Sequence, residues 1–329
     1  MTPSQDTQRA ADVLRRGGLV AFPTETVYGL GADAENPAAV ARLFAVKGRP
    51  STHPLIVHLA NAEALPRWAA RVPEAARRLA EACWPGPLTL LLEKSSRVPD
   101  ATTGGLGTVG LRVPDHSLAL ELLQRFGGGI AAPSANRFGR VSPTRAEHVL
   151  ADLGDDIDIL LDGGACQVGL ESTILDVTGE VPVLLRPGAV TVERIESLLG
   201  VRVSRAHLPG TRAPGLLPSH YAPEARVELA EASELYARAR ALSEQGERVA
   251  LLVSSDQLDD RATLAGSHDV VALDLGGSAE QAAQRLYDAL RAADARGATV
   301  VLASPPVASG LGEALADRLG KAAGPRGPT

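Results

Sequence analysis

The sequence predicts an α/β protein with two domains, the larger built on a mixed sheet and the smaller on a parallel one. Strand-like apolar runs alternate with amphipathic helical segments along most of the chain. The chain has 329 residues, of which 45% are hydrophobic, and this length suits two domains with separate cores. A proline- and glycine-rich stretch over 204–224 predicts a linker. We therefore expect domains over 1–203 and 225–329.

The N-terminal domain is expected to hold a twisted mixed sheet with flanking helices, since several strand pairs have short links. Asn36 before Pro37 predicts a helix start, because Asn caps a helix and Pro fits its first position. The other expected helices are 8–16, 73–83, 117–125, one opening at Ser142-Pro143, and 191–199 with Gly200 as its stop. The expected strands are 19–22, 55–59, 88–92, 109–113, 130–132, 157–161, 173–177 and 184–186.

The C-terminal domain repeats the alternation on a smaller scale. Its run VALLV (249–253) is typical of a strand buried on both faces. The expected strands are 226–229, 248–253, 270–273 and 299–303, and the expected helices are one ending at 245, 278–295 and 312–323. This order predicts a small Rossmann-like parallel sheet.

Charge and composition exclude several classes of protein. The net charge of −6 argues against a nucleic-acid surface as the main site. Only Lys47, Lys94 and Lys321 are lysines among 33 basic residues, a bias typical of a GC-rich genome. Lys47 stands out beside Arg49, because lysine supplies a compact point charge where arginine is the usual cation.

Metal, disulfide and membrane roles lack support in the sequence. Two cysteines are too few for a disulfide framework or a zinc site, and the seven histidines show no metal-binding spacing. We also find no signal-peptide pattern at the N-terminus and no apolar run near the roughly 18 residues of a membrane span. The expectation is a cytoplasmic protein without a protein-bound metal.

The most informative segment is 22–33, FPTETVYGLGAD. It follows a predicted strand and places two threonines, a glutamate and a tyrosine between a proline and two glycines. Such a polar strand end predicts a binding loop. Similar polar endings follow other expected strands, in IAAPSAN (130–136), LDGGACQVGLEST (161–173) and LLRPG (184–188).

Each of these endings alone is compatible with a turn, but their recurrence favours a shared site. Ligands of open α/β sheets bind at strand ends, and cations with hydroxyls suit a phosphate-bearing substrate. GLGTVG (105–110) matches the dinucleotide fingerprint formally, yet a strand follows it instead of a helix, so we reject that role. Walker A is absent. His58 in LIVHLA is compatible with either a core residue or a ligand contact.

The chain resembles the threonylcarbamoyl-adenylate (threonylcarbamoyl-AMP) synthases, a YrdC-like family, in their two-domain form. The resemblance covers the N-terminal domain almost end to end and includes the linker. The matching segments are FPTETVYGLG (22–31), KGRP (47–50), HPLIVHL (53–59), WPGPLTL (84–90), GLRVPDH (110–116), APSANRFGRVSPT (132–144), DGG (162–164) with GLESTILDV (169–177), LLRPG (184–188) and APGLLPSHYAP (213–223).

The resemblance implies a nucleotidyltransferase that converts L-threonine, bicarbonate or CO2, and ATP into L-threonylcarbamoyl-AMP and diphosphate. Mg²⁺ is expected on the ATP phosphates. The product would serve threonylcarbamoyladenosine modification of tRNAs that read ANN codons. Other proteins would transfer it to tRNA, so we expect no direct tRNA binding and no membrane partner.

The resemblance also assigns residues to the two substrates. Lys47 and Arg49 would be catalytic. Threonine would contact Thr26, His58, Arg112, Ser172 and the backbone near Ala132. ATP would contact Arg49, His53, Thr108, Ser134, Asn136, Ser142, Arg186 and, from a linker that we expect to close as a lid, Tyr221. His53 stands where many relatives carry asparagine, and Glu25 and Tyr28 have no assigned role.

Two other functions are considered. One is a non-catalytic RNA-binding or ribosome-assembly module of the same fold, which clustered lysines would favour. The other is a carbamoyl-transfer domain of the kind found in hydrogenase maturation, which would bring zinc-finger segments that two cysteines cannot supply. ATP consumption that requires both threonine and bicarbonate separates the three.

Overall fold

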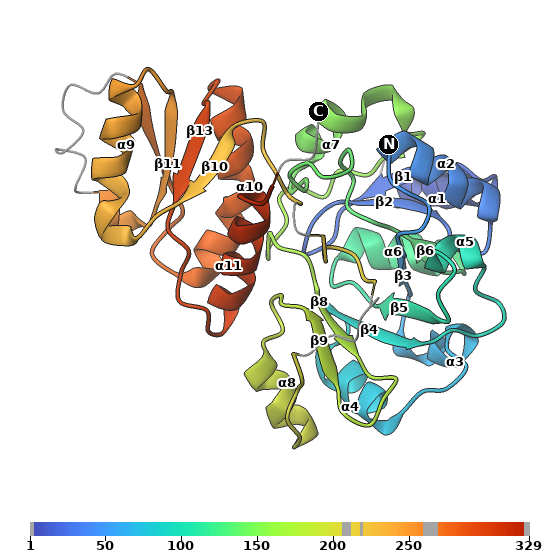
Figure 1. Cartoon of the computed structure of the whole chain (residues 1–329). Coiled ribbons are helices and arrows are strands. Elements are labelled where there is room, and N and C mark those ends of the chain that lie inside the picture. The colour runs from blue at the N-terminus through green and yellow to red at the C-terminus, as the bar shows by residue number, and fades with distance from the viewer. Residues whose placement is uncertain (1–2, 206–211, 218–219, 259–268, 326–329) are drawn as a thin grey trace. The chain divides into compact units, whose positions relative to one another are not determined.

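The computed structural model describes residues 3–205, 212–217, 220–258 and 269–325. The chain divides into two compact units (Figure 1). The first comprises Met1–Phe138, Ser142–Gln167 and Glu171–Leu216, and the second comprises Gly139–Val141, Val168–Leu170 and Leu217–Thr329. The predicted linker contains residues 206–211 and 218–219, which lie outside the described residues, so the linker and its closure stay predictions.

The first unit is built on a mixed sheet, as the sequence predicts. Among the described residues its strand order is β7-β1-β2-β6-β3-β5-β4-β8-β9. The pairs β1/β7, β3/β5 and β4/β8 are parallel and the other neighbours are antiparallel. The strands are β1 (Val20–Phe22), β2 (Gly29–Asp33), β3 (Ile56–His58), β4 (Leu88–Glu93), β5 (Thr108–Arg112), β6 (Ile130–Ala131), β7 (Ile159–Leu160), β8 (Thr173–Asp176) and β9 (Val183–Arg186).

Helices pack on both faces of this sheet (Figure 1). They are α1 (Pro3–Arg15), α2 (Pro37–Lys47), α3 (Leu65–Trp68), α4 (Glu74–Cys83), α5 (Asp100–Thr103), α6 (Ser117–Phe126), α7 (Ala146–Leu153) and α8 (Val192–Leu199), with the short turns η1 (Ala62–Ala64) and η2 (Gly154–Asp156). α1 and α6 share a core with β1 and β6 on one face. α2, α3, α4, α7 and α8 contribute to the larger core on the other face.

Alternation along the strands decides which side chains are left for function. In β5, Val109 and Leu111 enter the larger core, so Thr108, Gly110 and Arg112 point to the opposite face. β3 behaves in the same way, with Val57 in the larger core and His58 on the opposite face. That opposite face is the one that α1 and α6 cover at β1 and β6. The polar side chains of β3 and β5 therefore lie on the same face of the sheet as α1 and α6, next to the part that these helices cover.

The second unit is a small parallel sheet, as predicted. Its strand order is β10-β13-β11-β12, and every described pair is parallel. α9 lies on one face of the sheet and α10 and α11 lie on the other (Figure 1). The elements are β10 (Arg226–Leu229), η3 (Ala232–Glu234), α9 (Leu235–Glu244), β11 (Val249–Val253), β12 (Val270–Asp274), α10 (Ala279–Ala295), β13 (Val300–Ala303) and α11 (Leu311–Ala322). No described helix has the length and apolar character needed to cross a membrane.

Two expectations about the first unit are wrong. The helix predicted to open at Ser142-Pro143 begins at Ala146, because the carbonyl of Pro143 accepts a hydrogen bond from the distant Tyr28 amide. The second half of the 22–33 segment is the strand β2 and not a loop. Its glycines permit close packing: a Cβ on Gly31 would lie 2.7 Å from Ile130 Cγ2 and 2.9 Å from Phe22 Cε1.

The helix α2 begins where Asn36 and Pro37 predict, and both of its ends are capped. The Asn36 side chain accepts hydrogen bonds from the Ala38 and Ala39 amides at 3.1 and 3.2 Å. The helix ends at Lys47 because Gly48 adopts the left-handed conformation, with φ of 63°. The C-terminal cap thus places Lys47 in the last turn of the helix and Arg49 just after it.

Replacing Asn36 with alanine is expected to lower the free energy of unfolding by about 1 kcal/mol, because two N–H groups lose their acceptor. Urea denaturation followed by circular dichroism measures the change. Asn36→Asp keeps an acceptor and serves as the control, with stability close to that of the original protein. An equal loss in both variants would contradict a capping role.

Candidate active site

Thr24 folds the loop between β1 and β2. Its hydroxyl accepts hydrogen bonds from the Thr26 and Val27 amides at 3.1 and 3.2 Å and donates to the Val27 carbonyl at 2.6 Å. The Thr26 hydroxyl lies 2.8 Å from the Thr24 hydroxyl and is fully buried. Thr26 is therefore held in one position before any ligand is considered.

Tyr28 joins this loop to three other segments. Its amide donates to the Pro143 carbonyl at 2.9 Å, and its carbonyl accepts from the Ala135 amide at 2.8 Å. Its hydroxyl donates to the Gly164 carbonyl at 2.8 Å and accepts from the Gly163 amide at 3.1 Å. Burial raises the pKa of Tyr28, which keeps the phenol protonated. The residue thus has a structural role that the sequence leaves unassigned.

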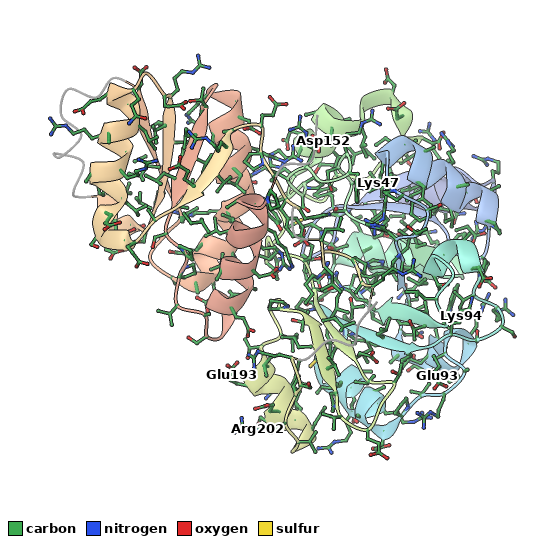
Figure 2. The ribbon with its side chains drawn as sticks, viewed as in Figure 1. Lys47, Glu93, Lys94, Asp152, Glu193 and Arg202 are labelled. Atoms are coloured by element: carbon green, nitrogen blue, oxygen red, sulfur yellow. The ribbon has the colours of Figure 1, made fainter. Side chains whose placement is uncertain are left out.

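Lys47, which is labelled in Figure 2, is the last residue of α2, and its side chain reaches the PSAN segment. Its ammonium donates to the carbonyl of Ser134 at 2.5 Å and to the carbonyl of Asn136. The side chain is almost fully buried, and burial, with a smaller effect from Arg49, holds its pKa well below the usual range. Because an ammonium has three donors, these two carbonyls leave one for a ligand.

Arg49 and His53 share Phe138 as a packing partner. The Arg49 guanidinium lies 5.8 Å from the centre of the Phe138 ring and donates to the Pro54 carbonyl at 3.1 Å. The His53 ring meets Phe138 edge-on, with centroids 5.4 Å apart. Burial, followed by the charge of Arg49, lowers the pKa of His53, so its ring is neutral near pH 7.

Arg112 and His58 stand side by side at the ends of the parallel strands β5 and β3. Arg112 Nε donates to the Gly86 carbonyl at 3.2 Å, and Arg112 Nη2 lies 2.7 Å from Glu25 Oε2. Burial, with a smaller effect from Arg112, lowers the pKa of His58 to about 3. The His58 ring packs edge-on against Phe22 at 5.9 Å. This corner therefore combines a neutral imidazole with a buried ion pair.

Arg186 and Ser172 form a second corner. Arg186 donates to the Ser172 carbonyl at 3.0 Å and to its hydroxyl at 3.1 Å, and it also reaches the Pro214 carbonyl at 3.1 Å. The hydroxyls of Ser172 and Thr89 lie 2.8 Å apart. Thr89 was missed in the sequence, although a single hydroxyl within the apolar run LTLLL is a usable signal.

The remaining contacts connect the corners. Ser142 donates to Glu171 at 2.6 Å, which ties the segment before α7 to the segment before β8. The Ala132 amide donates to the Ile56 carbonyl at 2.9 Å, so the chain after β6 runs beside β3. Thr108 shares the Arg112 face of β5. Every predicted site residue except Tyr221 belongs to the first unit.

Tyr221 belongs to the second unit. Its φ is 61°, a left-handed value that is unusual for tyrosine. Its ring lies 5.8 Å from the ring of Tyr287 and 5.1 Å from the guanidinium carbon of Arg318. These contacts bury it within that unit, and its predicted reach over the nucleotide stays a prediction.

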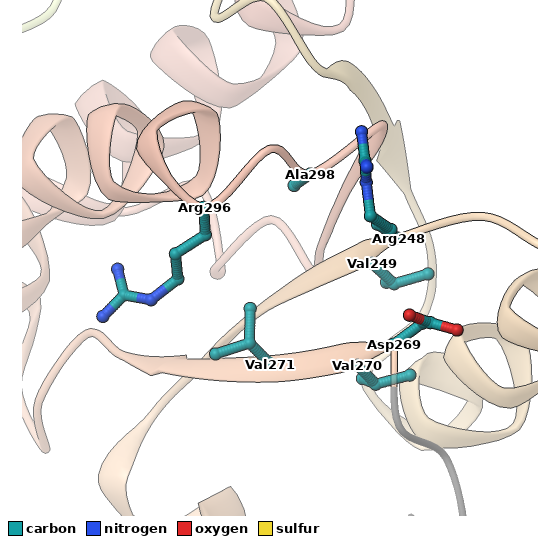
Figure 3. A pocket seen from close by; sticks show the side chains of 7 residues that line it. All are labelled: Arg248, Val249, Asp269, Val270, Val271, Arg296 and Ala298. Carbon is teal, nitrogen blue, oxygen red and sulfur yellow. The ribbon is translucent and has the colours of Figure 1, made fainter.

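The cavities described in the second unit offer weaker sites. One, of about 430 Å³, lies at the carboxyl ends of β11, β12 and β13 and is lined mostly by apolar side chains. Another, of about 170 Å³, lies at the opposite strand ends (Figure 3). Its Arg248 and Arg296 are exposed and project in different directions, so they do not converge on one anion. Within the described residues, no group of three or more His, Cys, Asp or Glu could hold a metal ion.

The fold and the clustered strand ends agree with the family matches. The Sua5/YciO/YrdC model, described as "Telomere recombination", matches residues 12–188. A second model, described as "Threonylcarbamoyl-AMP synthase, C-terminal domain", matches residues 190–324. The chain therefore belongs to the Sua5/YciO/YrdC family, in the form that carries the additional C-terminal domain. The family and the fold class predicted from the sequence are both confirmed.

Individual relatives match almost end to end. Threonylcarbamoyl-AMP synthase of Pyrococcus abyssi is 44% identical, over 96% of this chain and 94% of that protein. The Bacillus subtilis protein of the same name is 41% identical, over 97% and 93%. The crystal structure of P. abyssi Sua5 complexed with L-threonine superposes with a TM-score of 0.88 at 42% identity, over 97% of this chain and 94% of that one.

His58 is expected to stay uncharged between about pH 8 and pH 5, because its pKa is about 3 whereas a free imidazole titrates near pH 6.5. NMR of the imidazole protons, assigned with His58→Gln, measures this. Since the unfolded chain takes up the proton first, stability from this residue is fully present above about pH 6.5 and is lost as pH falls toward about 3. A His58 midpoint near 6.5 would show that the ring is not buried as described.

Proposed function

We propose that the chain is an L-threonylcarbamoyladenylate synthase, which converts L-threonine, bicarbonate or CO2, and ATP into L-threonylcarbamoyl-AMP and diphosphate. The observation that carries this proposal is that one unit buries four cations, Lys47, Arg49, Arg112 and Arg186, together with several hydroxyl groups. Near full-length similarity to proteins named threonylcarbamoyl-AMP synthase supports it.

The threonine subsite is proposed at Arg112, His58, Thr26, Ser172 and the backbone near Ala132. A guanidinium is suited to binding a carboxylate, and Arg112 is already oriented by the Gly86 carbonyl. A neutral imidazole donates with one nitrogen and accepts with the other, so His58 suits a hydroxyl partner. The related P. abyssi protein binds L-threonine in its crystal structure, which supports threonine as the substrate.

The ATP subsite is proposed along the neighbouring loops, with contacts from Arg49, His53, Thr108, Ser134, Asn136, Ser142, Arg186 and Tyr221. Lys47 would add its third donor and its charge against the phosphates. Lys47 already fixes the carbonyls of Ser134 and Asn136. The same contact therefore positions the PSAN segment and orients the ammonium.

The reaction requires no covalent enzyme intermediate. The amine of threonine adds to CO2 to give a carbamate, whose oxygen attacks the α-phosphorus of ATP in line and expels diphosphate. Arg112 and its neighbours would hold the nucleophile, while Lys47 and Arg49 would neutralise charge on the phosphates. Positioning and electrostatic stabilisation supply most of the catalysis in transfers of this kind.

Mg²⁺ is proposed to enter with ATP. When bound, it would neutralise phosphate charge. The two buried carboxylates at the site are engaged, Glu25 with Arg112 and Glu171 with Ser142. With both carboxylates engaged in this way, the ligands of Mg²⁺ would come mainly from the phosphates of ATP.

The product is proposed to serve threonylcarbamoyladenosine modification of tRNAs that read ANN codons. Separate transfer proteins would take it up, which agrees with a net charge of −6. A cytoplasmic location follows from this role.

Diphosphate release that depends on both threonine and bicarbonate tests the proposal. Lys47→Met is expected to lower kcat/KM at least about 100-fold, because a charge near the phosphates is removed. The matched control is Lys94→Met, since Lys94 pairs with Asp100 outside the site. Near-normal turnover by Lys47→Met, with an unchanged circular dichroism spectrum, would contradict the catalytic role. Arg49→Lys gives a second measurement if Lys47→Met does not fold.

A further inference from the structure

Glu25 is a buried carboxylate inside the proposed threonine subsite, and the assignments above give it no contact with substrate. Its side chain is 5% exposed and that of Arg112 is 4% exposed. The Oε2 to Nη2 distance is 2.7 Å, but the geometry is not that of an aligned hydrogen bond. Among the described residues, neither oxygen of Glu25 nor Arg112 Nη2 has a hydrogen-bond partner.

Such an arrangement is costly for an empty site. Buried charges lose their hydration, and each buried polar atom that lacks a hydrogen-bond partner destabilises the folded state further. The other buried carboxylate of the site, Glu171, accepts a hydrogen bond from Ser142 at 2.6 Å. Three buried side-chain atoms without a hydrogen-bond partner thus lie next to one another on the Glu25–Arg112 pair, and a bound ligand is one explanation for them.

We propose that Glu25 binds the α-ammonium group of threonine when the α-carboxylate takes its place on Arg112. The inference rests on the proposed function. An α-amino acid carries both charges on one carbon atom, and the ion pair offers the complementary charges side by side. Insertion of the zwitterion converts one ion pair into two. Glu25 would also keep Arg112 neutralised while the subsite is empty.

This contact places a proton acceptor at the reacting nitrogen. An ammonium has no lone pair, so it must lose a proton before it forms a bond. Glu25 takes that proton, the freed lone pair forms the C–N bond with CO2, and one C=O electron pair moves to oxygen. The nitrogen then releases a second proton to water, which leaves the carbamate anion. Glu25 returns its own proton to solvent before the next turnover.

If Glu25 only positions Arg112, its replacement should weaken the binding of any ligand that carries the carboxylate, with or without an ammonium group. We therefore compare threonine with (2S,3R)-2,3-dihydroxybutanoate, which replaces the ammonium with a hydroxyl. Isothermal titration calorimetry in the presence of a non-hydrolysable ATP analogue measures both affinities. The original protein is expected to prefer threonine at least about 10-fold, and Glu25→Gln is expected to bring this ratio close to 1. Equal weakening of both ligands, or no preference in the original protein, overturns the proposal.

Glu35→Gln is the matched control, because Glu35 pairs with Arg67 and Arg97 at 2.9 and 2.6 Å outside the site. It should leave the ratio unchanged. If Glu25→Gln does not fold, Glu25→Asp is measured instead, and a ratio equal to that of the original protein counts against the ammonium contact. The original protein's diphosphate release is assayed separately. If the original protein releases no diphosphate, the proposed function is refuted. The ratio of the two ligand affinities still tests the contact between Glu25 and the ammonium group.

Discussion

The hydrogen bonds of Tyr28 are the constraint on which the site depends. Tyr28 directly precedes β2, and its amide, carbonyl and hydroxyl bind segments from three other parts of the sequence. These segments are otherwise loops, whose positions would vary without a partner fixed by the sheet. One residue thus allows strand ends that are more than 100 positions apart to act as one surface.

The cations of the site are buried largely against backbone oxygens. Lys47 donates to two carbonyls, Arg49 and Arg112 to one each, and Arg186 to two. A carbonyl stabilises a cation through its dipole without cancelling the full charge. Lys47, Arg49 and Arg186 can therefore attract an anion such as a triphosphate while each keeps a fixed orientation, whereas the charge of Arg112 is balanced by Glu25.

Local signals in the sequence predict the elements well, and long-range contacts explain where they fail. Asn36 and Pro37 predict the start of α2, and the apolar run 109–113 predicts the strand β5 to within one residue at each end. The segment at Ser142 is misread because its partner, Tyr28, is distant in sequence. Thr89 is missed for a similar reason, since Ser172 lies 83 residues away. The strand ends could be identified from the sequence, but the pairings among them could not.

The strand β5 has a consequence for the size of the ligand. A strand advances about 3.3 Å per residue, so the backbone positions of Thr108 and Arg112 are about 13 Å apart on one face. Gly110, midway between them, adds no side chain to that face. Because β5 pairs with β3 on one side and with β4 on the other, this spacing is fixed by the sheet. Under the proposed assignment, Arg112 contacts the carboxylate of threonine and Thr108 contacts ATP, so β5 sets the distance between these two contacts. Removing one residue between them would turn one contact to the opposite face.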